Sequence, residues 1–210
     1  GDRMSILVVA EHDNSELKSP TLVALAAAQA IGGDIDILVA GSGIAGVAQQ
    51  AAAVPGVNKV IGADNETYEN QLAENIAGLV EQLSDGYSHI LAAHTTSGKN
   101  FLPRVDAGLG VAQISDIVSV VSTDTFKRPI YAGNAIATVK SNDPIKVISV
   151  RGTAYDAVPS EGGTGIIETT DVVCNPGLSS FVKEEIAKSE RPELTSADVI
   201  ISGGRGMQNG

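Results

Sequence analysis

The sequence has no tryptophan and a single cysteine, Cys174. One cysteine cannot form a disulfide within the chain, which excludes a disulfide scaffold and fits a reducing compartment. Aromatic residues make up only 3% of the chain, whereas glycine alone contributes 23 of the 210 residues. Many small residues and few aromatic ones suit helices that pack closely on a sheet.

Basic residues are also scarce, with 14 lysines and arginines against 25 acidic residues and a formal net charge of −11. Nonspecific nucleic-acid binding needs basic patches, so no nucleic-acid partner is expected. The apolar runs are far shorter than the ~20 residues of a membrane-spanning helix, and no basic-plus-apolar leader is present. Residues 1–3 are interpreted as a cloning remnant, and Met4 directly before the first apolar run favours a bacterial cytoplasmic protein.

The first half of the chain alternates between buried strands and helices. Continuous apolar runs bounded by polar or turn residues predict strands at 5–10, 35–40, 57–61 and 88–93. Helical spacing of apolar residues and Gly or Pro stops predict helices at 21–31, 44–54, 70–83 and 98–108. Ser19 before Pro20 is the expected N-cap of the first helix. This alternation predicts an α/β fold, a three-layer parallel sheet flanked by helices.

The alternation of predicted strands and helices ends near residue 117. Apolar segments at 118–121, 130–140 and 145–150 are separated by turn signals and by no helix pattern, which predicts an additional antiparallel β segment. A loop is expected at 158–164 and a charged, helical connector at 181–189. We place a domain boundary at Arg191-Pro192. It divides an N-terminal α/β domain (4–190) from the truncated start of a second α/β domain (191–210).

A formal G-x-G-x-x-G pattern runs from Gly41 to Gly46, between a predicted strand and a predicted helix, with Asp64 after the next strand. In a dinucleotide-binding fold such glycines let the backbone approach a pyrophosphate, and the acid binds the ribose. The pattern follows the second strand and not the first, which favours an ordinary turn. An NAD-dependent oxidoreductase of the Rossmann type remains the alternative function.

The three histidines, His12, His89 and His94, are candidate ligands or bases. His12 and His94 end predicted strands, at the sheet edge where open α/β folds bind ligands. No spacing typical of a metal site accompanies them, so hydrogen-bonding roles are favoured and no metal is expected. Arg104 and Arg151 are interpreted as ion-pairing or subunit-contact residues.

The sequence ends on a predicted buried strand at 197–201 that runs into a glycine-rich turn, Ser202-Gly203-Gly204-Arg205-Gly206. Glycines allow backbone N–H groups to approach an anion closely. Arg205 adds a planar cationic donor, suited to a phosphate or to the electron-rich edge of a flavin.

This turn and several other segments resemble the alpha subunit of electron transfer flavoproteins, and the resemblance extends from Met4 to Gly206. The segments that carry it are LVVAEH (7–12), GKNFLPRV (98–105), ISDI (114–117), YAGNA (131–135), VRGT (150–153), RPELT (191–195) and SGGRG (202–206).

The resemblance implies a heterodimer with a beta subunit and an electron carrier that is not an enzyme. Through FAD it would take electrons from acyl-CoA dehydrogenases of fatty-acid β-oxidation and related flavoproteins, and pass them to a membrane quinone oxidoreductase. It implies a cytoplasmic location in bacteria and the mitochondrial matrix in eukaryotes. It also implies that Arg205 contacts FAD, that Ser202, Gly203, Gly204 and Gly206 shape the turn, and that no residue is catalytic. Because most of the family's flavin site lies beyond Gly210, we expect this chain to bind FAD weakly or not at all.

Overall fold

Strands far apart in the sequence meet in one parallel sheet of order β10-β3-β2-β1-β4-β9-β5. The computed structural model describes residues 4–185, 194, 197 and 199–208. Within them the strands of this sheet are β1 Ser5–Val9, β2 Asp34–Gly41, β3 Val57–Asp64, β4 His89–Ala93, β5 Gln113–Ile117, β9 Lys146–Val150 and β10 Ile166–Thr169. A second, antiparallel sheet consists of β6 Ser119–Ser122, β7 Thr125–Ile130 and β8 Ala135–Lys140. The α/β class and the additional antiparallel segment are therefore confirmed.

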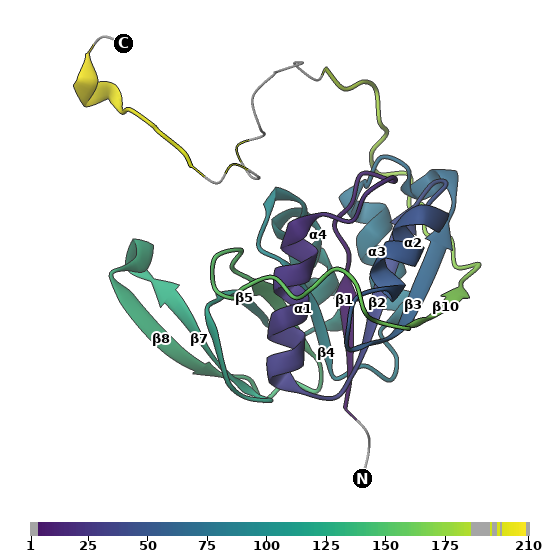
Figure 1. The fold of residues 1–210 in the computed structure, drawn as a ribbon, viewed down its shortest axis with the longest axis horizontal. Coiled ribbons are helices and arrows are strands. Elements are labelled where there is room, and N and C mark those ends of the chain that lie inside the picture. Colours follow the sequence, from purple (N-terminus) through teal and green to yellow (C-terminus); the bar gives the residue numbers. More distant parts are fainter. Residues whose placement is uncertain (1–3, 186–193, 195–196, 198, 209–210) are drawn as a thin grey trace.

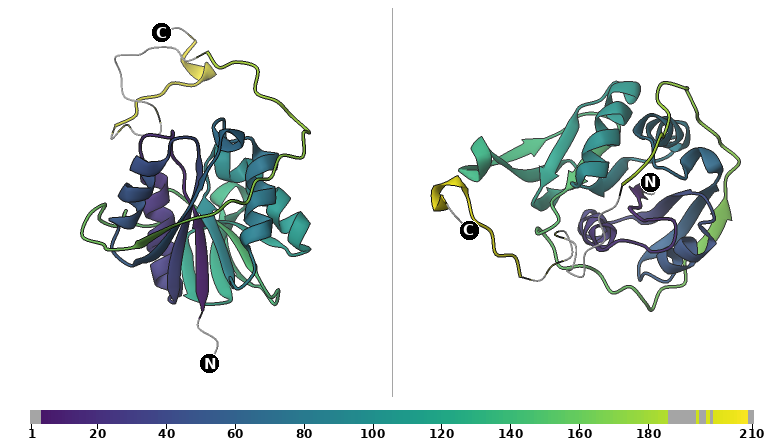
Figure 2. Two further views of the ribbon diagram at one scale, coloured as in Figure 1. Left: turned by 90° about the vertical axis from the view of Figure 1, so that its right-hand side faces the viewer. Right: turned by 90° about the horizontal axis from the view of Figure 1, so that it is seen from above.

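Four helices cover the parallel sheet on both faces, as Figure 2 shows (left). These helices are α1 Ser19–Ile31, α2 Ala45–Ala52, α3 Ala73–Leu83 and α4 Thr96–Leu109. In the central strand β1, Ile6 and Val8 pack with α1 and α2, and Leu7 and Val9 pack with α3 and α4. Because side chains alternate between the faces of a strand, each face receives its own apolar set. The continuous apolar runs in the sequence follow from this burial on both faces.

The first helix begins at Ser19, two residues before the predicted range of 21–31. Lys18 occupies the N-cap position, Ser19 is the first helical residue, and no side chain caps the helix. Pro20 lies in the first turn, where its missing N–H has no helical partner to lose. The predicted stop is confirmed, since Gly32 adopts φ +86° and its N–H bonds to the carbonyl of Ala28.

Two predictions about the region after residue 117 are wrong. The segment 145–150 is not antiparallel. As β9 it lies between β4 and β5 and runs parallel to both, because its alternate faces are apolar and only the central sheet buries both. The segment 130–140 is not one strand, since the chain turns at η2 Tyr131–Gly133, with positive φ at all three residues, and returns as β8. Figure 1 shows β7 and β8 projecting from the main body.

The chain then crosses the outside of α1 to reach the opposite edge of the sheet (Figure 1). The Val158 N–H bonds to the Leu22 carbonyl, and Gly163 and Gly165 donate to the carbonyls of Ala53 and Ala52 at the end of α2. A Cβ on Gly163 would lie 2.2 Å from the Val54 carbonyl oxygen, so this close approach requires glycine. The loop expected at 158–164 is confirmed, and strand β10, which follows it, was not predicted.

The expected strand at 197–201 and the helical connector at 181–189 are absent from the described residues of these segments. Residues 181–185 have no helical structure, and Val199, Ile200 and Ile201 are exposed and unpaired there. A strand forms only when a neighbour pairs its backbone groups, and none of the described strands lies beside these residues. The expected boundary at Arg191-Pro192 lies outside the described residues.

Candidate functional site

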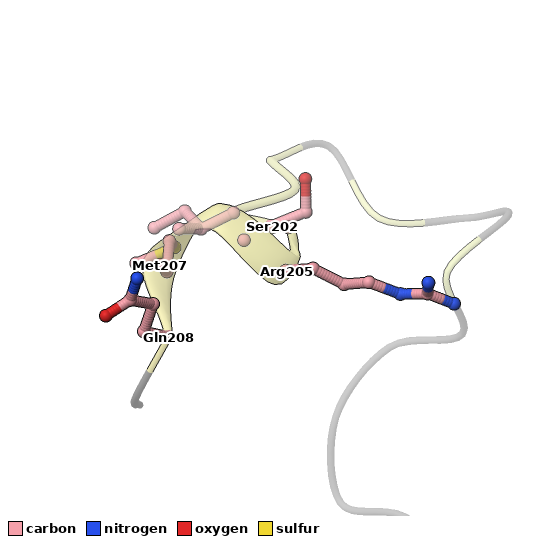
Figure 3. A pocket seen from close by; sticks show the side chains of 7 residues that line it. Ser202, Arg205, Met207 and Gln208 are labelled. Carbon is pink, nitrogen blue, oxygen red and sulfur yellow. The ribbon is translucent and has the colours of Figure 1, made fainter.

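The predicted flavin-contacting turn is a short exposed segment. Its single helical turn, η3 Arg205–Met207, is held by a bond from the Met207 N–H to the Gly204 carbonyl at 3.0 Å. An open hollow of about 460 Å³ is lined by residues 201–205, 207 and 208. Figure 3 shows the Arg205 side chain extending away from Met207 and Gln208. The arginine therefore presents its guanidinium to the surroundings of the turn.

Only part of the donor set for a flavin lies in this turn. Arg205 is the one charged side chain between residues 199 and 208. A Cβ on Gly203 would lie 2.2 Å from the Met207 sulfur, whereas Gly204 and Gly206 have open space beside them. The turn suits one anionic or electron-rich edge of a flavin, but all residues from 199 to 208 are exposed and form no enclosing wall. Small-molecule sites bury most of their ligand, so these residues alone fit only a corner of FAD.

The Gly41–Gly46 pattern is a structural turn whose amides are already bound. The Gly43 N–H donates to Asp64 Oδ1 at 2.7 Å, and the Ser42 N–H donates to Asn14 Oδ1 at 3.1 Å. A Cβ on Gly41 would lie 2.2 Å from that Asn14 oxygen. The N–H groups that would bind a pyrophosphate thus already donate to side-chain oxygens of the chain. Asp64, the acid that would bind a ribose, accepts one of these bonds. This geometry speaks against NAD binding here.

The crevice between β1 and β4 is also bridged by the chain. The strand order reverses between these strands, which is where open α/β sheets often bind ligands. Here the Thr95 hydroxyl donates to Glu11 Oε2 at 2.6 Å and accepts the Gly98 N–H at 3.3 Å as the N-cap of α4. Glu11 is therefore a structural partner of α4.

Two of the histidines are buried in structural positions. His89 is 1% exposed, and its Nε2 donates to the Thr123 carbonyl at 2.6 Å. His12 Nδ1 accepts the Asn14 N–H at 3.0 Å beside the Gly41 turn. Burial lowers the pKa of both histidines, against smaller opposing effects of backbone carbonyls. Within the described residues no group of His, Cys, Asp and Glu side chains could hold a metal ion.

The third histidine belongs to a polar cluster that sequence reasoning did not assemble. His94 follows β4, Asp116 lies near the end of β5, and Arg151 follows β9. Arg151 donates to both Asp116 oxygens, from Nε at 3.0 Å and from Nη2 at 2.6 Å. The fully buried Ser149 lies beneath, with its Oγ 2.8 Å from His94 Nδ1 and 2.9 Å from the Asp116 nitrogen. The ion pair expected for Arg151 is therefore confirmed. Only the inserted position of β9 brings these residues together.

The segment after β10 is fastened at two points, to Tyr68 in the 3-10 turn Glu66–Tyr68 and to Glu74 in α3. The buried Tyr68 hydroxyl donates to the Val172 carbonyl at 3.1 Å and accepts the Cys174 N–H at 2.8 Å. Further along, the Ser179 hydroxyl donates to Glu74 Oε2 at 3.0 Å, and Arg104 lies 3.5 Å from the other oxygen of Glu74. The ion pair expected for Arg104 is confirmed. The described residues contain no helix that is long and apolar enough to cross a bilayer.

Comparison with known proteins agrees with the resemblance. Residues 6–173 match the family model described as the electron transfer flavoprotein domain. The chain is 60% identical over 207 residues to the electron transfer flavoprotein subunit alpha of Pseudomonas aeruginosa, with 99% of this chain and 67% of that protein covered. It is 52% identical over 206 residues to that of Bradyrhizobium diazoefficiens (98% and 65%). It is 46% identical over 220 residues to the mitochondrial subunit of Dictyostelium discoideum (97% and 62%). The chain spans about two thirds of the length of these relatives. On this evidence the chain belongs to the electron transfer flavoprotein family, and within that family to the alpha subunits.

Proposed function

We propose that this chain is the N-terminal part of an alpha subunit that pairs with a beta subunit and carries electrons through FAD. The complete protein would accept electrons from acyl-CoA and other flavoprotein dehydrogenases and deliver them to a membrane quinone oxidoreductase. It would act as a carrier, without turning over a substrate of its own. Its place would be the bacterial cytoplasm, or the mitochondrial matrix in a eukaryote. The observation that carries the proposal is the family match over residues 6–173.

In this proposal Arg205 is the residue of this chain that contacts FAD, and Ser202, Gly203, Gly204 and Gly206 shape the turn that presents it. Bound FAD would supply the chemistry, since a flavin accepts and releases one or two electrons. The guanidinium is always charged and offers a planar donor fork, so it would hold negative charge near the ring. The exposure of the whole turn supports weak binding by this chain alone.

The small antiparallel sheet is the surface that we assign to the beta subunit. It projects from the body (Figure 1) and exposes Val121, Tyr131 and Ile136, with Tyr131 81% exposed. Isolated apolar side chains are ordinary on a surface. Three large ones on one short projecting sheet and its connecting turn η2 are better suited to contact with a partner.

The proposal is tested first by the intact mass and the visible absorption spectrum of the purified chain. A mass of 21.5 kDa without flavin absorbance is expected. FAD is then titrated into the chain alone and into its mixture with the beta subunit. Firm FAD binding by the 21.5 kDa chain alone would contradict our account of where the cofactor is held.

The role of Arg205 is tested in a longer alpha subunit that carries the rest of the flavin site, assembled with the beta subunit. Arg205→Gln should weaken FAD binding and shift the flavin reduction potential. Lys183→Gln, which removes an exposed cation of the connector, should change neither property. Equal effects of the two substitutions would refute a specific role of Arg205.

A further inference from the structure

The cluster around His94 lies at one edge of the sheet, far along the chain from the predicted flavin turn. His94, Asp116, Arg151, Gly152 and Thr153 line a pocket of about 330 Å³. It opens at the carboxyl ends of β4, β9 and β5, which are neighbours in the sheet. Parallel strands direct the loops that follow them to this edge, where open α/β sheets bind ligands. The pocket is open to solvent and large enough for a small polar group.

The hydrogen bonds beneath the pocket orient the His94 ring. Ser149 is fully buried, and its oxygen accepts the Asp116 N–H at 2.9 Å and lies 2.8 Å from His94 Nδ1. In the tautomer in which the Ser149 hydroxyl donates to Nδ1, and in the protonated imidazole, His94 carries a proton on Nε2. His94 Nε2 lies 3.8 Å from Asp116 Oδ1, beyond hydrogen-bond reach, so it can donate this proton to a ligand at the pocket.

Arg151 retains donors for a ligand even though it is paired. A guanidinium has five N–H groups, and Asp116 takes one from Nε and one from Nη2. The Arg151 side chain is 42% exposed, whereas that of Asp116 is only 16% exposed. Beside it, no partner within the described chain is found for the Thr153 hydroxyl or for the Gly152 and Thr153 N–H groups. The pocket therefore gathers unused hydrogen-bond donors from two loops, those after β4 and β9.

The charge around His94 is positive, in contrast to the acidic chain as a whole. Burial lowers the pKa of His94, Asp116 opposes this effect, and the cations Lys99, Arg151 and Arg128 add to it. Burial would raise the pKa of Asp116, but Arg151, His94 and Arg128 outweigh it and hold that pKa below its usual value. Asp116 is thus the one anion, and Lys99, Arg151 and Arg128 are the three cations, whose charges influence the pKa of His94. This excess of cations around the imidazole favours an anion.

The backbone at the pocket is held in a sparsely populated conformation. Asp116 has φ +61°, which costs a residue other than glycine of the order of 1 kcal/mol and persists only where the surroundings enforce it. Its N–H bond to Ser149 and its carboxylate bond to Arg151 provide that enforcement. This conformation aims the carboxylate at Arg151 and leaves the outer donors of Arg151 facing solvent.

We propose that this pocket is an anion-binding site, which takes the phosphate or carboxylate group of a small molecule through the His94 Nε2–H, the outer N–H groups of Arg151 and the donors of the 152–153 turn. The remainder of the ligand lies in solvent, because the pocket holds only a head group. This site is separate from the flavin turn and does not depend on FAD.

The test follows the histidine ring signals by NMR while inorganic phosphate is added to the 210-residue chain, with sodium chloride at matched ionic strength as the blank. The His94 signals should shift and saturate, with a dissociation constant of about 1 mM or below. His12 and His89 are internal controls, since they are 8% and 1% exposed and face other surroundings. Phosphate should also raise the pKa of His94, which a purely structural cluster would not show.

Matched variants assign the effect to the pocket. Arg151→Gln should weaken phosphate binding at least tenfold, whereas Arg104→Gln, which removes an arginine paired with Glu74 on α3, should leave it unchanged. Lys99→Gln should weaken binding a few fold without disturbing the fold, since the exposed Lys99 side chain bonds to no residue that the structure describes. This variant keeps the test valid if Arg151→Gln unfolds.

Acetate in place of phosphate distinguishes the sources of the anion. Saturation by both ions would support a general oxyanion site, and saturation by phosphate alone would support phosphorylated ligands. A His94 shift that does not saturate, or that is equal in the wild type and in Lys99→Gln and Arg151→Gln, would overturn the proposal.

Discussion

Replacing Tyr68 with phenylalanine removes the hydroxyl that ties the segment after β10 to the α/β body. Tyr68 is fully buried, and its oxygen bonds both to the Val172 carbonyl and to the Cys174 N–H. Phenylalanine keeps the buried ring, so the substitution removes two hydrogen bonds and little packing. Burial also raises the pKa of Tyr68, so the group that is lost is a neutral hydroxyl at any physiological pH.

The expected loss follows from the two bonds. A typical intramolecular hydrogen bond contributes about 0.5–1.5 kcal/mol to stability, so Tyr68→Phe should lower the free energy of unfolding by about 1–3 kcal/mol. The freed groups of Val172 and Cys174 belong to partly exposed residues and can reach water, which favours the lower half of this range. The loosening should be local to the segment after β10.

Two measurements check this expectation. Urea unfolding gives the change in stability, and amide hydrogen exchange should become faster at Cys174 while the exchange of β1 follows only the global change. Tyr131→Phe is the matched control, because Tyr131 is 81% exposed and its hydroxyl makes no hydrogen bond to a residue of the described chain. Equal stability of Tyr68→Phe and wild type, together with unchanged exchange at Cys174, would refute the fastening role of Tyr68.

Three further substitutions or conditions give distinct outcomes. Gly78→Ala should destabilise the wild type, because the added Cβ would lie 2.1 Å from the Cys174 sulfur. In a Cys174→Ala background the same substitution should raise the free energy of unfolding by up to about 1 kcal/mol, because alanine has the higher helix propensity. A change of the same sign in both backgrounds would contradict this. Thr95→Val should cost roughly 2–4 kcal/mol in urea unfolding, through loss of the helix cap and of the bond to Glu11. Burial lowers the pKa of all three histidines in the folded chain. Below about pH 6.5, the pKa of a histidine in the unfolded chain, the unfolded chain therefore binds more protons than the folded chain. Above about pH 6.5 the histidines should therefore not reduce the free energy of unfolding. As the pH drops below that value, the free energy of unfolding should decrease by up to about 1.4 kcal/mol per pH unit for each histidine. A flat profile between about pH 7.5 and 5.5 would count against this reasoning.

The local pattern of the sequence was sufficient for the first half of the fold. The strands from β1 to β4 and their helices follow from apolar periodicity and glycine stops, because each helix packs on a strand next to it in sequence. The place of β9 could not be predicted in this way. Its residues have the same apolar pattern as any buried strand, and only the pairing with both β4 and β5 distinguishes a parallel insertion from an antiparallel hairpin.

For the candidate sites too, contiguous residues could be found from the sequence, whereas residues brought together by the fold could not. The Ser202–Gly206 turn was found because its residues are contiguous and resemble a known motif, but the strand predicted before it needs neighbours that the described chain does not provide. The His94 pocket combines residues 94, 116 and 151, whose closeness depends on the strand order. Asp116 was visible only within a family motif, and Arg151 was interpreted as an ion-pairing or subunit-contact residue. No sequence signal connected either residue with His94.

The insertion of β9 between β4 and β5 also bears on how the chain folds during synthesis. When β5 leaves the ribosome, its neighbour in the finished sheet has not been made, because 28 residues lie between Ile117 and Lys146. At the usual 5–20 residues per second this delay lasts about 1.5–6 s. During it β4 presents an open edge, and β10 completes the other edge later still. The nascent chain should therefore be most exposed to misfolding and to chaperones in this interval, before residue 150 emerges.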